Sequence, residues 1–160
     1  MPCTTPSIYQ IFSSPIGDLW ICQTGNALTG LTIGPPGDST GLCRSQTPLL
    51  TETARQLSAY FGGRLHQFDL PLDPAGTPFR KKVWQALRTI PYGQTRTYKE
   101  LALQVDSPRA FRAVGQANHF NPIMILIPCH RVIGADGRLT GYAYGTGVKQ
   151  FLLDLERRHS

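Results

Sequence analysis

The sequence has no hydrophobic stretch long enough to cross a membrane. Its longest aliphatic run, residues 123–127, is far shorter than the roughly 20 apolar residues that a spanning helix needs. The N-terminus has neither the basic start nor the apolar segment of a signal peptide. We therefore expect a cytoplasmic protein, next to the chromosome if the source is bacterial, that makes no contact with membranes.

Cysteine is scarce, and no two cysteines form a CxxC pair. Without an export signal we expect the thiols to be reduced, which excludes a disulfide-stapled secreted fold. The four cysteines are Cys3, Cys22, Cys43 and Cys129. We assign the first three to the hydrophobic core, where free cysteines usually lie.

Charged residues make up only 16% of the sequence, and the two signs are unevenly distributed. Residues 1–75 carry three basic and five acidic side chains, whereas residues 76–160 carry thirteen basic and five acidic ones. A net charge of about +8 on the second half predicts contact with a polyanion, most simply nucleic acid. A basic face that only contacts solvent would give the same composition.

The first half has the pattern of short strands followed by a helix. Three segments rich in apolar and β-branched residues, at 7–12, 18–22 and 28–33, are separated by turn signals and predict an antiparallel meander. Apolar residues from Leu50 to Phe61 then recur at helical spacing, and a glycine pair at 62–63 stops the helix. Residues 68–72 fit either one more strand or an extended link.

The most favourable domain boundary is Asp73-Pro74-Ala75-Gly76, and beyond it the chain has well-marked helix starts. Thr77 followed by Pro78 predicts an N-cap with proline at the first helical position, and a Pro-Tyr-Gly turn at 91–93 ends that helix. Thr97 and Glu100 form a capping box that opens a short helix to about residue 105. We therefore expect an N-terminal domain over 1–75 and a C-terminal domain over 76–160.

A further helix follows after a tight turn. The Asp-Ser-Pro segment at 106–108 ends the short helix and predicts a cap for the next, which runs from Arg109 to about His119. Two short helices joined by a tight turn, the second carrying Arg109 and Arg112, are similar to a helix-turn-helix. Many helical hairpins share this pattern, but the basic second half favours a role in DNA binding.

The apolar, strand-like run at 123–127 leads directly into Cys129, His130 and Arg131. A cysteine next to a histidine and an arginine lies where its thiolate would be stabilised. Adjacent residues of an extended chain point to opposite faces, so a direct Cys129–His130 hydrogen bond requires a turn or a bridging water. The local pattern alone leaves a catalytic cysteine and a structural core cysteine equally open.

The segment Ile127-Pro128-Cys129-His130-Arg131-Val132-Ile133-Gly134 resembles the active-site signature of the O6-alkylguanine-DNA alkyltransferases, also called methylated-DNA–protein-cysteine methyltransferases. Further motifs follow in the family's order and spacing across residues 76–158. They are Gly76-Thr77-Pro78-Phe79, Val83-Trp84, Ile90-Pro91-Tyr92-Gly93, Arg112-Ala113-Val114-Gly115, Ala117-Asn118, Asn121-Pro122, Lys149, Leu152-Leu153 and Glu156. Residues 1–75 match only loosely, through Ser14-Pro15-Ile16-Gly17 and Tyr60-Phe61-Gly62-Gly63.

The resemblance implies an enzyme that acts once, moving the alkyl group of O6-alkylguanine to its own Cys129. Methyl is the expected group, and O4-alkylthymine is a secondary substrate. The reaction needs a thiolate, because a neutral thiol is a poor nucleophile. The family's chemistry implies that His130 takes the thiol proton through a bridging water, that Glu156 holds and polarises His130, and that Tyr98 donates its hydroxyl to guanine N3. Asn121 would tie the recognition-helix turn to the active-site segment.

Each of these residues also has an ordinary structural interpretation. Glu156 would be a solvated acid near the end of a helix. Tyr98 would be a half-buried tyrosine at a helix start, and Asn121 with Pro122 would simply form a turn.

An alkylated guanine inside a duplex is out of reach, so the resemblance implies that the nucleotide is flipped into a pocket. Arg112 matches the arginine finger that fills the gap in the base stack, although a surface or phosphate-binding arginine would look the same. The family docks this helix in the minor groove of double-stranded DNA, where Ala110 and Ala113 permit close approach and Arg109 adds charge. Phe111 stands where a small residue is frequent, so groove fit or helix packing differs.

The implied substrate pocket has a lid at Gly141–Gly145, in which Tyr144 replaces a common glycine. A bulky side chain there either narrows the pocket against large adducts or packs outward. Backbone groups near Cys129 and Val132 would recognise the exocyclic amine of guanine. The pocket residues are Pro128, Val132, Tyr142, Ala143 and Tyr144.

No metal or cofactor is expected. Some relatives hold a structural zinc in the N-terminal domain, but Cys3 and Cys22 do not align with its ligands, and the chemistry needs none. The predicted fold class is α/β (α+β). A small antiparallel-sheet domain with a helix supports a mainly helical domain with a winged-helix-like helix-turn-helix, and the protein acts as a monomer.

Two other functions fit parts of the sequence. The first is a DNA-binding module without alkyl transfer. Lesion-binding relatives of this kind lack the cysteine, whereas Cys129 is present here, and a transcription regulator would usually carry an effector domain as well. A cysteine hydrolase using Cys129 and His130 would turn over and ignore DNA, and it leaves the Arg112 and Asn121 motifs unexplained.

Overall fold

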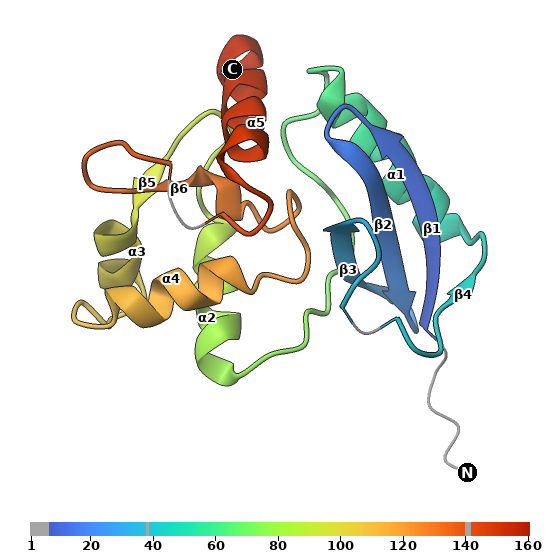
Figure 1. Ribbon diagram of the computed structural model, residues 1–160, viewed down its shortest axis with the longest axis horizontal. Coiled ribbons are helices and arrows are strands. Elements are labelled where there is room, and N and C mark those ends of the chain that lie inside the picture. The colour runs from blue at the N-terminus through green and yellow to red at the C-terminus, as the bar shows by residue number, and fades with distance from the viewer. Residues whose placement is uncertain (1–6, 38, 140–141) are drawn as a thin grey trace. The chain divides into compact units, whose positions relative to one another are not determined.

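The computed structural model describes residues 7–37, 39–139 and 142–160, and the chain divides into two compact units (Figure 1). One unit ends at Pro74 and the other begins at Ala75. The first is built around a sheet and the second around helices, so the predicted α/β (α+β) class is confirmed. Within the described residues no helix is both long and apolar enough to cross a bilayer.

The first unit contains the predicted meander. Its strands are β1 (Ser7–Ser14), β2 (Gly17–Thr24), β3 (Ala27–Ile33) and β4 (Cys43–Arg44), in the sheet order β3-β2-β1-β4. The first three pair antiparallel, with Ser14 opposite Gly17 at the β1–β2 turn, whereas β4 runs parallel to β1. The two-residue β4 was not predicted, because so short a strand has no periodic signal.

Helix α1 (Pro48–Phe61) packs against β1 and β2. The side chain of Thr47 caps it by accepting a hydrogen bond from the amide of Leu50, and the chain leaves it at Gly62, as predicted. Apolar side chains of the helix and the strands form one core. Its fully buried members are Leu19, Ile21, Leu28, Leu31, Leu50, Leu57 and Tyr60.

Residues 68–72 form an extended link with a single bridge between Leu28 and Leu72. The cysteines of this unit differ from one another. Cys22 is buried, as predicted, but Cys43 is exposed on the two-residue β4, so its predicted place in the core is wrong. Cys3 lies outside the described residues.

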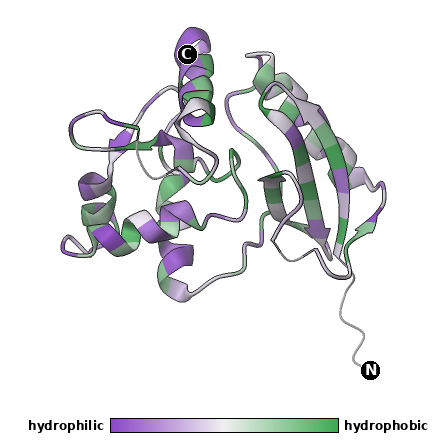
Figure 2. Ribbon diagram, in the orientation of Figure 1, coloured by the Kyte–Doolittle hydropathy of each residue, from purple (hydrophilic) through white to green (hydrophobic). Residues whose placement is uncertain are grey.

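The second unit is mainly helical. Its helices are α2 (Pro78–Leu87), α3 (Tyr98–Gln104), α4 (Phe111–His119), the 3-10 turn η1 (Cys129–Arg131) and α5 (Thr146–His159). A two-stranded parallel sheet joins β5 (Arg96–Thr97) to β6 (Val132–Ile133). In Figure 2, hydrophobic and hydrophilic bands alternate along α4 and α5, as expected for helices with one face in a core.

Both predicted helix starts are confirmed by their hydrogen bonds. The Thr77 hydroxyl accepts from the amide of Arg80 at 3.2 Å. Thr97 and Glu100 make both bonds of the capping box, at 3.1 and 3.2 Å. Helix α2 ends earlier than predicted, at Leu87, and a short turn carries the chain to Ile90.

The start of α4 differs from the prediction. The helix begins at Phe111, with Ala110 at the N-cap position and no side-chain cap. The Ser107 hydroxyl bonds to the carbonyl of Val105 instead of capping the next helix. Arg109 and Ala110 therefore lie in the turn between α3 and α4, and the prediction that they belong to the second helix is wrong.

The apolar run at 123–127 is a buried turn and not a strand. The amide of Ile127 donates to the carbonyl of Ile123 at 3.0 Å, and Ile125 has a positive φ of 69°. Asn121 closes this turn from the side, because its Nδ2 donates to the Ile127 carbonyl at 2.8 Å while its Oδ1 accepts from the Ile123 amide at 3.0 Å. The run is apolar because it is buried, and burial alone does not specify a strand.

Candidate active site

Cys129 and His130 belong to the tight 3-10 turn η1, and both are buried. The turn removes the difficulty that an extended chain would separate the two side chains. The N-terminal end of the turn is fixed by Asn118, whose Nδ2 donates to the Cys129 carbonyl at 3.3 Å. Trp84 Nε1 in turn donates to the Ala117 carbonyl at 2.8 Å, which ties α2 to α4.

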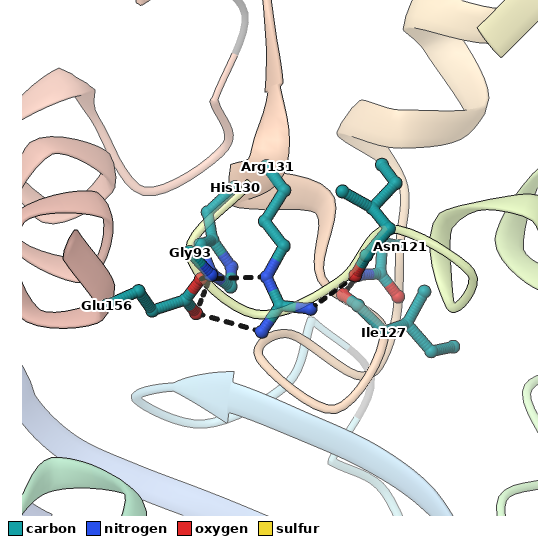
Figure 3. Close-up of polar contacts among 7 residues, drawn as sticks. Gly93, Asn121, Ile127, His130, Arg131 and Glu156 are labelled. Carbon is teal, nitrogen blue, oxygen red and sulfur yellow. Dashed lines mark hydrogen bonds and ion pairs between the residues drawn. The ribbon is translucent and has the colours of Figure 1, made fainter. Parts of the chain in front are cut away.

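His130 forms a buried pair with Glu156 of α5 (Figure 3). The His130 Nε2 and Glu156 Oε2 atoms are 2.6 Å apart, and neither side chain is exposed. Burial by itself raises the pKa of Glu156, but hydrogen bonds from His130 and Arg131 and the charge of Arg131 outweigh it and hold the pKa well below the usual range. Glu156 is therefore ionised and anchors the imidazole.

Arg131 completes this anchor, a role that the sequence did not reveal. Its Nε and Nη2 atoms donate to the two oxygens of Glu156 at 2.8 and 3.0 Å (Figure 3). Its Nη1 donates to the Ile90 carbonyl at 2.7 Å. The amide of Gly93, whose φ is +77°, donates to Glu156 Oε1 at 3.3 Å. Arg131 was expected to stabilise the Cys129 thiolate, but its charge is directed to the carboxylate instead.

The state of His130 follows from its surroundings. Burial lowers its pKa, opposed by Glu156, so the neutral imidazole is the resting form. An ionised acceptor on the Nε2 side places the ring proton there and leaves the lone pair on Nδ1. Nδ1 is buried and has no hydrogen-bond partner within the described part of the chain. That nitrogen can accept a proton.

Cys129 lies in a polar setting despite its burial. Burial raises the pKa of its thiol above the usual value, and the polar groups of Asn121 and Tyr142 and the charge of Lys149 offset only part of that rise. The neutral thiol is thus the resting form, and groups from three parts of the chain favour the thiolate once the proton is removed.

Lys149 is a second residue whose role the sequence did not indicate. Its side chain is fully buried in α5, and its Nζ lies 5.9 and 5.8 Å from the ring centroids of Tyr98 and Tyr142. Burial lowers its pKa to about 8, and the charge of Cys129 opposes that shift. A lysine near the start of the last helix carries no local signal of this environment.

The implied pocket residues have different surroundings. Pro128, Val132 and Tyr142 are buried, Tyr144 is half-buried and Ala143 is exposed. The rings of Tyr142 and Tyr144 meet edge to face with centroids 5.8 Å apart. Tyr98 stands half-buried at the start of α3, and burial raises the pKa of its hydroxyl. Gly141, the first residue of the expected lid, lies outside the described residues.

The implied DNA-binding residues lie at the beginning of α4 and just before it. Arg112, Phe111 and Ala113 are exposed in the first turn of the helix, Arg109 is exposed in the preceding turn, and Ala110 is half-buried. The opposite face of α4 is buried through Val114, Ala117 and Asn118.

Two family models match the chain. The DNA-binding domain of 6-O-methylguanine DNA methyltransferase matches residues 78–158, and the ribonuclease-like domain of the same enzyme matches residues 7–74. The chain belongs to the O6-methylguanine-DNA methyltransferase family. The resemblance found in the sequence is confirmed, and it extends through the N-terminal half that matched only loosely.

Relatives of this methyltransferase chain are similar over nearly their whole length. A methylated-DNA–protein-cysteine methyltransferase of Methanosarcina barkeri is 50% identical over 159 residues, which cover 94% of this chain and 98% of the relative. One from Mycolicibacterium paratuberculosis is 48% identical over 95% of this chain and 93% of its own. The crystal structure of Mycobacterium tuberculosis OGT in complex with DNA superimposes with a TM-score of 0.90 at 46% identity, covering 96% of this chain and 94% of that one.

Proposed function

We propose that this methyltransferase repairs O6-methylguanine in double-stranded DNA by transferring the methyl group to Cys129. Membership in the family makes it an enzyme of direct-reversal repair that uses a protein cysteine. The observation that carries the assignment of residues is the buried His130, anchored through Nε2 by ionised Glu156 and open at Nδ1, one residue from Cys129. This is the arrangement that activates a nucleophile.

The proposed reaction uses these residues in the following order. The Cys129 thiol proton passes through a bridging water to His130 Nδ1, and Glu156 stabilises the imidazolium that forms. The thiolate attacks the methyl carbon, the bond from that carbon to O6 breaks, and its electron pair stays on the guanine. The Tyr98 hydroxyl donates to N3 and takes up the charge of the departing base. The thioether at Cys129 is stable, so each molecule acts once.

DNA is engaged through the first turn of α4, which enters the minor groove. Arg112 fills the gap that the flipped nucleotide leaves in the stack, while the small side chains of Ala110 and Ala113 allow the backbone to approach. Arg109 contacts the phosphate backbone from the preceding turn. Such contacts favour search along any sequence, as damage repair requires.

The flipped base occupies a pocket with Cys129 at its end. Backbone groups near Cys129 and Val132 recognise the exocyclic amine, and O4-alkylthymine is a secondary substrate. The unit ending at Pro74 has a supporting role, and the other unit carries the chemistry. The protein acts as a monomer on cytoplasmic DNA. No metal or cofactor takes part in the reaction. The remaining pocket residues are Pro128, Tyr142, Ala143 and Tyr144.

The test is the intact mass of the protein after incubation with a duplex that carries one O6-methylguanine. We expect a gain of one methyl group per chain, located on Cys129, with no further gain at longer times. The Cys129→Ala variant is the control and should gain nothing. A duplex with unmodified guanine should leave both proteins unchanged.

Other outcomes identify the alternatives. Tight binding of the lesion with no mass gain would indicate a binding module without transfer. Repeated turnover of a small ester or amide at Cys129, unaffected by DNA, would indicate a hydrolase. Either result would overturn the proposal.

A further inference from the structure

Phe111 is an aromatic side chain exposed at the start of a helix that binds DNA in the proposed function. Large apolar side chains that stay exposed among the described residues are Leu103 (63%), Phe120 (51%) and Phe111 (42%). One face of the Phe120 ring is contacted by the Arg80 guanidinium, whose carbon lies 4.8 Å from the ring centroid. Phe111 instead directly precedes Arg112, the residue assigned to the gap in the base stack.

Helix geometry places Phe111 on the side of α4 that faces the active site. Residues four apart lie on the same side of a helix, so Phe111 and Gly115 share a flank. A Cβ atom at Gly115 would lie 4.0 Å from two ring carbons of Tyr98. Arg112 is rotated by about 100° from Phe111, toward solvent. Around the helix, Gly115 lies about 40° from Phe111 and about 60° from Arg112, so Phe111 and Arg112 border, from its two sides, the flank of α4 that meets Tyr98.

The surroundings of Phe111 match duplex DNA in charge. Arg109 and Arg112 flank it within three residues, and both are exposed. The half of the chain beyond residue 75 carries a net charge of about +8. Cationic residues hold the phosphates, and an apolar ring between them contacts the bases of the groove.

We propose that Phe111 is a wedge that stacks on the base next to the flipped nucleotide, while Arg112 occupies the gap. This inference rests on the proposed function. Flipping leaves one neighbouring base without its stacking partner, and a flat apolar ring replaces part of that contact. Every base has an aromatic face, so the contact does not depend on which base is stacked. It favours base-pair steps that unstack readily. Phe111 and Arg112 together thus stabilise the opened base stack.

The test compares single-turnover methyl transfer from a duplex with transfer from free O6-methyldeoxyguanosine, which has no stack to open. We expect the duplex-to-nucleoside rate ratio of Phe111→Ala to fall by roughly 5- to 150-fold, the range of a lost base–aromatic stack. Phe111→Leu keeps an apolar wedge and should retain most of the ratio. Leu103→Ala removes a more exposed apolar side chain from α3 and should match the unchanged protein.

A second readout follows the neighbouring base directly. With 2-aminopurine beside the lesion, binding of the unchanged protein should alter its fluorescence, and Phe111→Ala should alter it less. An unchanged rate ratio in Phe111→Ala would overturn the wedge while leaving the proposed function intact. An equal fall in the rates with the duplex and with the nucleoside would assign Phe111 a structural role, and it would also overturn the wedge. If the unchanged protein takes methyl from neither substrate, the proposed function itself fails.

Discussion

Arg131 and Glu156 form a two-point ion pair in the interior, with Nε–Oε1 and Nη2–Oε2 distances of 2.8 and 3.0 Å. The residues are 25 positions apart in the sequence. The pair fixes the carboxylate that holds His130 and so connects the fold of α5 to the chemistry proposed at η1. Breaking it therefore affects both stability and reaction rate.

Replacing Glu156 by glutamine should leave Arg131 as a buried charge without its counter-ion. We expect Glu156→Gln to lower the free energy of unfolding by about 3–5 kcal/mol and to slow methyl transfer. Urea unfolding and single-turnover kinetics measure the two effects. The matched control is Asp154→Asn on the same helix, whose pair with Arg157 at 3.5 Å is exposed and contributes about 0–1 kcal/mol. Equal losses in the two variants would contradict the assignment.

The stability of the protein should fall at acidic pH. The pKa values of Glu156 and His130 are both lowered in the folded state, so the unfolded chain binds more protons as the pH decreases. The contribution of His130 is complete above its unfolded pKa of about 6.5 and is lost below it, and that of Glu156 is lost below about 4.3. Each proton changes the free energy of unfolding by up to about 1.4 kcal/mol per pH unit.

Denaturant unfolding at pH 7.5, 6.0, 5.0 and 4.0 measures this decline. His130→Gln should flatten the part of the curve just below pH 6.5, because the titrating group is gone. A free energy of unfolding that stays constant down to pH 4 would contradict the prediction.

Lys149 should favour the thiolate of Cys129. Replacing it with methionine keeps much of the buried volume but removes the charge that lowers the pKa of the thiol. We expect Lys149→Met to shift the pH profile of Cys129 alkylation by iodoacetamide to higher pH and to slow the reaction severalfold at pH 7.5. Lys149→Arg keeps the charge and should retain a profile closer to that of the unchanged protein. A profile that Lys149→Met leaves in place would show that the ammonium does not act on the thiol.

Tyr144 should restrict the size of the alkyl group. Its ring packs edge to face on that of Tyr142, which is close enough to Cys129 to affect the pKa of its thiol, so in the proposed function Tyr144 narrows the space for the adduct. We expect Tyr144→Gly to raise the rate with O6-benzylguanine severalfold relative to the rate with O6-methylguanine in a duplex. Tyr144→Phe, which keeps the ring, should not change that ratio. A lower benzyl rate in Tyr144→Gly would mean that the ring helps to bind the adduct.

Local signals predicted most of the fold and failed where contacts are distant. Thr77, Thr97 and Glu100 marked helix starts correctly because caps depend on neighbours within one turn. The run at 123–127 was assigned as strand-like because its apolar residues are buried, and only the bonds from Asn121 show that it is a turn.

At the candidate site, too, local signals were informative and contacts between distant residues were not predictable. The signature around Cys129 pointed to the family, which is confirmed, while the roles of its individual residues stay predictions. The partnership of Arg131 with Glu156 and the position of Lys149 between two tyrosine rings depend on how α5 packs against η1. Neither has a counterpart in the local sequence pattern. Cys43 was misplaced for a related reason, since a lone cysteine carries no information about the strand edge on which it lies.

The four hydrogen bonds that Glu156 accepts have a consequence for the proton released in repair. Each oxygen receives two donors, from His130 and Arg131 on one side and from Arg131 and Gly93 on the other. A carboxylate has about four lone-pair positions, so none is left for a proton. Glu156 therefore acts as a fixed negative charge and does not itself take up and pass on the proton. In the proposed reaction, the proton taken from Cys129 therefore stops at His130 and leaves along the path by which it came, toward the water and the departing guanine.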